Sequence, residues 1–174
     1  MPFALTGDPA KKTGHMRFPG TVSLSPEAFG AVARDVAESA ISAGFRNVYL
    51  MGDHGGGQDI LKKVAGELDA QWAPKGVRVR HVPDLYYKSQ EQEKQYLSAR
   101  GLTVGAHAGM PDTAQVMYLD EKRWIRRDKL APGDKTNGVD GDPRQASAEI
   151  GKVFIQYKID SAVEQIRKMA AGKE

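Results

Sequence analysis

The feature that most constrains the fold is an alternation of helix and strand patterns between residues 25 and 82. Ser25-Pro26-Glu27 is typical of a helix start, because a hydroxyl cap is followed by proline and by an acid at the positive helix end. Gly44 is suited to ending this helix in the left-handed conformation. Between these signals the apolar residues predict one packing stripe: Phe29, Val32, Val36, Ala40 and Ile41.

Two short apolar runs predict strands on either side of a second helix. The runs are Phe45–Met51 and Val77–Val82, and the helix pattern begins at Gln58 and is broken at Pro74. Helices and strands in this order favour parallel strands joined by right-handed crossovers. Ligands gather at the carboxyl ends of such strands, which here points to the loop that carries Asp53 and His54.

The remaining sequence predicts a surface helix over 89–100, a helix capped by Asp112, a long loop over 130–144 and a last helix over 145–170. The length of 174 residues and the hydrophobic content of 40% predict one soluble globular domain over 1–174. The small net charge of +3, scattered along the chain, does not suggest nucleic acid as a partner. Apolar runs are too short to predict a membrane span, and the chain shows no signal peptide, so both cytoplasm and periplasm stay open. Without cysteine, a metal would have to use His, Asp or Glu.

Four histidines carry the candidate chemistry, and their local patterns differ. His81 alternates with valines inside a predicted strand, which favours a structural or solvated role. His54 precedes three glycines, Gly55, Gly56 and Gly57, which could let a substrate or metal approach backbone amides. A phosphate-cradling turn or a merely tight turn is the alternative for this loop.

The second small-residue loop surrounds His107 and lies five residues before Asp112. The two side chains could converge on one ligand, but Asp112 could equally serve as a helix cap. His15 lies just before a predicted turn, where substrate contact and plain surface exposure are both open.

Three segments, taken in order, resemble the creatininase (creatinine amidohydrolase) family: 15–24 (His-Met-Arg-Phe-Pro-Gly-Thr-Val-Ser-Leu), 52–57 (Gly-Asp-His-Gly-Gly-Gly) and 107–113 (His-Ala-Gly-Met-Pro-Asp-Thr). The likeness continues through 138–143 into the final helix. It implies a three-layer α/β fold with a mostly parallel sheet flanked by helices. It also implies a metal-dependent hydrolase of cyclic amides or related C–N bonds, with zinc or manganese as cofactor and often a hexameric assembly.

The resemblance assigns roles to residues of this chain. His54 occupies the position of a metal ligand in the family's Asn-Gly-His-Gly-Gly-Asn pattern, and Asp53 adds a carboxylate beside it. His107 and Asp112 are the implied catalytic residues. His15 and the three loop glycines are the implied substrate-binding residues.

The chain also departs from the family pattern. Met110 stands where the family's His-Ala-Gly-Glu motif has a glutamate, and a thioether is a poor ligand for zinc or manganese. Gly52 and Gly57 replace the flanking asparagines, and Ala114 replaces a serine. Family members carry further ligands in an N-terminal βα unit, whereas this sequence starts almost at the segment 15–24, so we expect that unit to be missing.

Two hypotheses therefore stay open. The first is a metal-dependent hydrolase in which His54, with Asp53 or Asp112, holds the metal, and His107 moves a proton or polarises the substrate carbonyl. The second is a catalytically degraded homologue without metal that binds a small ligand or acts in assembly. A homo-oligomer is expected under both, since strands exposed by the missing unit would need a covering partner.

Overall fold

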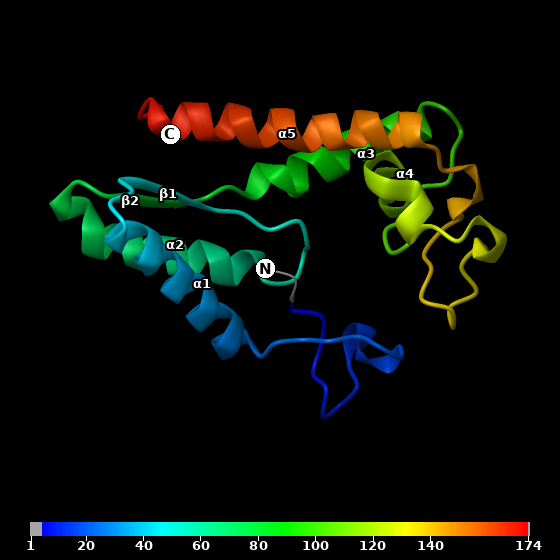
Figure 1. Ribbon diagram of the computed structural model, residues 1–174, viewed down its shortest axis with the longest axis horizontal. Coiled ribbons are helices and arrows are strands. Elements are labelled where there is room, and N and C mark those ends of the chain that lie inside the picture. Colours follow the sequence, from blue (N-terminus) through cyan, green and yellow to red (C-terminus); the bar gives the residue numbers. More distant parts are fainter. Residues whose placement is uncertain (1–4, 174) are drawn as a thin grey trace. The chain divides into compact units, whose positions relative to one another are not determined.

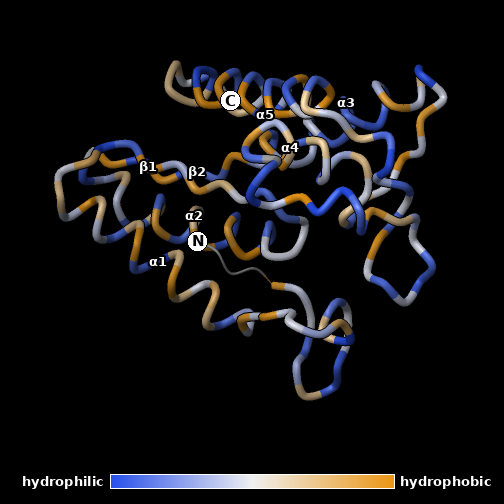
Figure 2. Tube along the Cα trace, turned by 45° about the vertical axis from the view of Figure 1, so that its right-hand side comes forward, coloured by the Kyte–Doolittle hydropathy of each residue, from blue (hydrophilic) through white to orange (hydrophobic). Residues whose placement is uncertain are grey.

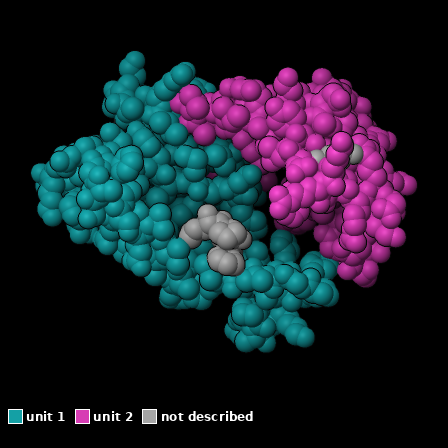
Figure 3. Space-filling view, viewed as in Figure 1, with its two compact units in different colours: residues 1–86, 164–174 teal, residues 87–163 magenta. Residues whose placement is uncertain are grey.

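The structure is a computed structural model that describes residues 5–173. The chain divides into two compact units, drawn in different colours in Figure 3. Unit 1 comprises residues 1–86 and 164–174, and unit 2 comprises residues 87–163. Each unit is described separately below.

Unit 1 contains the alternation that the sequence predicts (Figure 1). Its elements are α1 (Pro26–Ser42), β1 (Asn47–Leu50), α2 (Gln58–Trp72) and β2 (Arg78–His81), followed at the far end of the chain by the last turns of α5 (Ala148–Ala170). The predicted start of α1 is confirmed, because the Ser25 hydroxyl accepts a hydrogen bond from the Ala28 amide at 3.1 Å. Gly44, at φ +98°, follows its end as expected.

The sheet of unit 1 consists, within the described residues, of β1 and β2. The two strands are parallel, with Asn47 opposite Arg78 and Leu50 opposite His81. Helix α2 provides the crossover, and α1 lies beside it on the same side of the strands (Figures 1 and 2). The predicted α/β fold, with helices flanking a parallel sheet, is confirmed.

The packing stripe of α1 differs from the prediction. Val32 and Val36 are 39% and 59% exposed, and the buried side chains are spaced by four residues: Phe29, Ala33, Ala37 and Ile41. This row forms one ridge along the helix, and its two alanines let α1 approach its neighbours closely. Apolar and polar segments alternate along α1 and α2 in Figure 2. The core of unit 1 is completed by four residues of α2, one of β2 and one just before β2: Leu61, Val64, Ala65, Leu68, Val79 and Val77.

Unit 2 is built mainly from helices: α3 (Tyr87–Ser98), α4 (Met110–Trp124) and α5 up to residue 163. Phe154 of α5 is fully buried, and the Tyr96 ring meets it edge-on with centroids 5.4 Å apart. The surrounding core includes Leu97, Met110, Ala114, Met117 and Ala146. None of the helices in residues 5–173 combines the length and the apolar character needed to cross a bilayer.

Candidate functional site

The first candidate site lies at the carboxyl edge of the β1–β2 sheet. The loop Gly52–Gly57 follows β1, and His81 is the last residue of β2. Since the register pairs Leu50 with His81, both features lie at the same edge of the sheet. This is the edge at which open α/β sheets bind ligands.

Gln58, the first residue of α2, connects the loop to His81. Its side chain is 2% exposed, and its Nε2 donates to the carbonyl oxygens of Gly52 and His54, both at 2.8 Å. Its Oε1 lies 2.9 Å from Nε2 of His81. Because both amide hydrogens are used, Oε1 accepts the bond and the His81 Nε2 carries the proton.

His81 therefore has a structural role, one of the two that the sequence favoured, and it supports the loop through Gln58. Burial lowers the pKa of His81, the charge of Lys62 lowers it further, and Asp59 opposes both effects. The neutral ring is thus favoured, with its proton on Nε2. The signal that could have identified this residue is its place at the end of a parallel strand, where polar side chains reach a ligand-binding edge.

The ring of His54 is held by the backbone of its own loop. Its Nδ1 lies 3.0 Å from the Gly56 amide nitrogen and 3.3 Å from the Gly56 carbonyl oxygen. Within the described residues no hydrogen-bond partner is found for its Nε2. The neighbouring Asp53 side chain is exposed. The Nε2 of His54 is therefore the ring nitrogen that the contacts within the loop leave for a ligand.

Each of the three glycines after His54 is in close contact with other parts of unit 1. A Cβ at Gly55 would lie 2.8 Å from the Tyr86 hydroxyl oxygen, and a Cβ at Gly56 would overlap the Leu5 carbonyl. Gly57 has φ +94°, and a Cβ there would lie 2.9 Å from the Phe29 ring. Packing thus accounts for the small residues, and their substrate-binding role stays a prediction.

His15 lies in a short 3-10 turn, Gly14–Arg17, also in unit 1. Its amide donates to the Thr6 carbonyl at 3.0 Å, and its carbonyl accepts from the Phe18 amide at 2.9 Å. The side chain is half-buried. Its role in substrate binding stays a prediction.

The second candidate site is the loop around His107 in unit 2. The His107 carbonyl accepts a 2.7 Å bond from the Asp140 amide, and the Asp140 carboxylate accepts a 3.0 Å bond from the Ala106 amide. Added Cβ atoms at Gly105 and Gly109 would both overlap the Asp140 carbonyl oxygen. The small residues of this loop therefore allow two backbone segments to touch, while the His107 side chain is exposed.

Asp112 does not cap α4 in the way the sequence predicts, because the helix begins two residues earlier, at Met110. From the first turn its carboxylate instead reaches back and accepts a 2.9 Å bond from the Ala108 amide. The Thr113 hydroxyl donates to the Ala108 carbonyl at 3.1 Å. Asp112 thus stabilises the helix start from inside the helix and keeps an exposed carboxylate close to the His107 loop.

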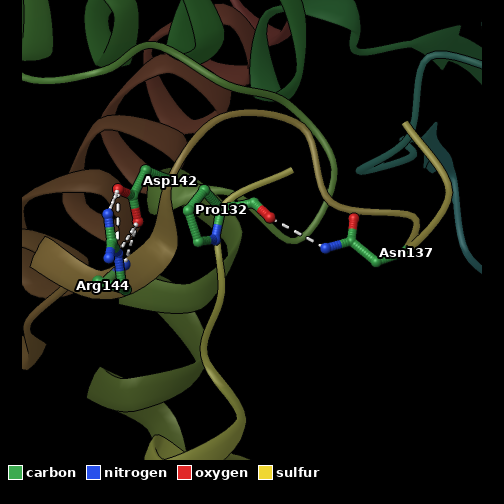
Figure 4. A network of polar contacts seen from close by, with 4 residues as sticks. All are labelled: Pro132, Asn137, Asp142 and Arg144. Atoms are coloured by element: carbon green, nitrogen blue, oxygen red, sulfur yellow. Dashed lines mark hydrogen bonds and ion pairs between the residues drawn. The ribbon is translucent and has the colours of Figure 1, made fainter. Parts of the chain in front are cut away.

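The predicted long loop of unit 2 is ordered by local polar contacts (Figure 4). The Asn137 side-chain amide donates to the Pro132 carbonyl at 3.0 Å. The Arg144 guanidinium binds both carboxylate oxygens of Asp142, with a shortest distance of 2.7 Å, and lowers the pKa of that carboxyl. These contacts frame residues 139–141, which pack against the His107 loop.

The structure thus brings the predicted residues together in two sets, Asp53 with His54 in unit 1 and His107 with Asp112 in unit 2. The expectation that both loops face one cleft stays a prediction. Within residues 5–173, no three His, Asp or Glu side chains form a group able to hold a metal ion. A catalytic zinc needs about three protein ligands, so Asp53 and His54 do not complete such a centre by themselves.

Solved structures with the same fold include creatininases. A mutant creatininase of the Zn-Zn type has a TM-score of 0.73 and 17% sequence identity, over 95% of this chain and 72% of that chain. A mutant creatininase complexed with creatine has the same score and identity, over 95% and 73% of the two chains. A manganese creatininase has a TM-score of 0.71 and 18% identity, over 95% and 72%. The fold is therefore the creatininase fold.

A family model described as creatinine amidohydrolase matches residues 9–166. The chain therefore belongs to the creatininase family. A comparison with curated protein sequences yields no match.

Proposed function

We propose that the chain hydrolyses a C–N bond of a small cyclic amide, as a metal-dependent member of the creatininase family. The observation that carries this proposal is the His54 imidazole at the carboxyl edge of a parallel sheet, with Nδ1 engaged by Gly56. Membership of the family and the zinc, manganese and creatine named for the similar structures support it. The proposal assigns His54 and Asp53 as ligands, and at least one further ligand has to join this pair.

The hydrogen bonds of His54 set a condition for its use as a ligand. A neutral imidazole that coordinates through Nε2 carries its proton on Nδ1, and that proton needs an acceptor. The Gly56 carbonyl oxygen, 3.3 Å from Nδ1, is such an acceptor, whereas the Gly56 amide competes for the unprotonated Nδ1. Ligation therefore favours the contact to the carbonyl over the contact to the amide.

The roles proposed in unit 2 do not require those residues to be ligands. His107 is exposed and is proposed to move a proton during hydrolysis, and the nearby Asp112 carboxylate is proposed to assist it. His15 and the three loop glycines are proposed to contact the substrate. The expected homo-oligomer, a hexamer by resemblance, belongs to the same proposal, and sedimentation velocity of the purified protein tests it.

The test compares two histidine variants of protein purified without chelator. Elemental analysis is expected to find stoichiometric zinc or manganese in the parent and in His107→Ala, and none in His54→Ala. Hydrolysis of a panel of cyclic amides should be lost in both variants. Absence of both metal and turnover in the parent would refute the proposal.

One observation favours a second function, that of a small-ligand-binding homologue without turnover. Met110, which stands where the family motif has a glutamate, is 1% exposed and packs in the core of unit 2. This position therefore serves packing and supplies no carboxylate. Thermal-shift screening with the same cyclic amides separates the two functions, because the second predicts stabilisation without product.

A further inference from the structure

Gln58 satisfies three hydrogen-bonding partners from a position that is almost fully buried. Its side-chain nitrogen bonds the carbonyls of Gly52 and His54, and its side-chain oxygen accepts from His81. The three partners come from the loop after β1 and from the end of β2. One side chain thus connects both parts of the sheet edge.

The amide has only one workable orientation. If it were turned over, its oxygen would face two carbonyl oxygens at 2.8 Å, and its nitrogen would face the His81 Nε2. Both carbonyls would then lose their donor in a partly buried place, which is unfavourable. The two carbonyls thus set the orientation, and in this orientation the amide oxygen faces the His81 Nε2, so a proton on that nitrogen stabilises it further.

The two carbonyls that Gln58 holds flank the residues on which the site depends. The Gly52 carbonyl belongs to the peptide group just before Asp53, and the His54 carbonyl belongs to the peptide group just after His54. Fixing these two peptide groups fixes the directions in which the two side chains leave the backbone. It also keeps the Gly56 peptide within reach of the His54 Nδ1.

From this geometry we infer that Gln58 is the positioning residue of the His54 loop, and that His81 holds the Gln58 amide in its working orientation. As far as it concerns metal affinity, this inference rests on the proposed function. Partners that orient a metal ligand typically change metal affinity by about 10- to 100-fold when they are removed. The same size of effect is expected here for zinc.

The zinc test uses variants that separate hydrogen bonding from packing. Gln58→Met keeps the length of the side chain and removes its polar atoms, and it should bind zinc about 10- to 100-fold more weakly than the parent. His81→Leu removes the donor to Gln58 and should weaken zinc to a similar extent. His81→Gln places an amide donor close to the position of the imidazole Nε2, and its affinity should stay within about threefold of the parent. This rescue is not expected if the two residues merely fill space.

A second readout does not depend on metal. Ring nitrogen NMR at neutral pH should show His81 in the Nε2–H form, and the Gly56 amide should exchange with solvent faster in Gln58→Met than in the parent. Finding His81 in the Nδ1–H form, or equal zinc affinity in Gln58→Met and parent, overturns the inference. If Gln58→Met does not fold, the zinc affinities of the two His81 variants test the inference instead. A His81→Leu affinity equal to that of the parent overturns it. A parent that binds no zinc but shows the expected ring form and exchange refutes the proposed function and supports the positioning role.

Discussion

Replacing Gly57 by alanine should destabilise unit 1, for two independent structural reasons. Gly57 lies where the loop becomes α2, and its φ of +94° is a conformation that side-chain-bearing residues rarely adopt. Its added Cβ would also lie 2.9 Å from one ring atom of Phe29 and 3.0 Å from another. Phe29 is 6% exposed within the core and has little room to move.

The expected magnitude follows from these two contributions. The left-handed conformation costs a non-glycine residue about 1–2 kcal/mol. Overpacking against a buried ring costs about 1–3 kcal/mol. The free energy of unfolding should therefore fall by about 2–5 kcal/mol in Gly57→Ala. The matched control is Gly66→Ala in the same helix, where a Cβ meets nothing within 4 Å and helix propensity should add about 0.5–1 kcal/mol.

The assay is urea unfolding followed by tryptophan fluorescence. Trp72 lies in unit 1 and Trp124 in unit 2, so a Trp124→Phe background leaves a signal that reports on unit 1. Gly57→Asn separates the two costs, because asparagine tolerates the left-handed conformation while its Cβ still meets Phe29.

The result also bears on the role of the glycine loop. If Gly57 is small only to admit a ligand, alanine should weaken ligand binding, and the unfolding free energy should fall by no more than the cost of the left-handed conformation, about 1–2 kcal/mol. A Gly57→Ala protein whose stability lies within about 0.5 kcal/mol of its parent would refute the packing argument.

Two further predictions concern contacts away from the loop. Asp69 accepts bonds from Arg78 and from the Val79 amide, and these contacts, Arg78 foremost, lower its pKa. The Asp69 carboxylate should therefore stabilise the fold above about pH 4, and this effect should disappear as the pH falls through the lowered pKa. Asp69→Asn should lose about 1–2 kcal/mol of unfolding free energy at pH 7. In urea unfolding, the unfolding free energy of this variant should fall less steeply with decreasing pH than that of the parent. In unit 2, a Cβ at Gly151 would overlap the backbone carbonyl of Ala114. Gly151→Ala should therefore lose about 2 kcal/mol or more of unfolding free energy, despite the better helix propensity of alanine. Urea unfolding followed by the fluorescence of Trp124 measures this loss.

The order of elements in unit 1 could be predicted because each signal is local. The Ser25 cap, the Gly44 stop and the break at Pro74 act through the backbone of their own neighbourhood, and the structure confirms the helices and strands between them. The packing stripe of α1 could not be predicted in the same way. Hydrophobicity favoured Val32 and Val36, whereas close helix packing selected smaller side chains that a hydrophobicity pattern ranks lower.

The two small-residue loops could be predicted from the sequence, but the side chains that support the first loop could not. Both small-residue loops were identified correctly, and the sequence could not distinguish what their glycines meet. In the first loop the glycines Gly55 and Gly57 face the side chains of Tyr86 and Phe29, while the glycines of the second loop face the backbone at Asp140. A glycine in the sequence therefore indicates that other atoms approach the backbone closely, but it does not distinguish a ligand from another part of the chain.

The supporting residues were missed because their signal is topological. His81 fits an alternating strand pattern, and Gln58 looks like an ordinary residue at a helix start. Parallel pairing of β1 with β2 places the end of one strand beside the loop after the other, and only then does a buried amide at the start of α2 reach both. In a strand–loop–helix–strand unit, the first helical residue and the last residue of the second strand therefore merit the same scrutiny as the glycine loop, since the loop's carbonyls need buried donors wherever water is excluded.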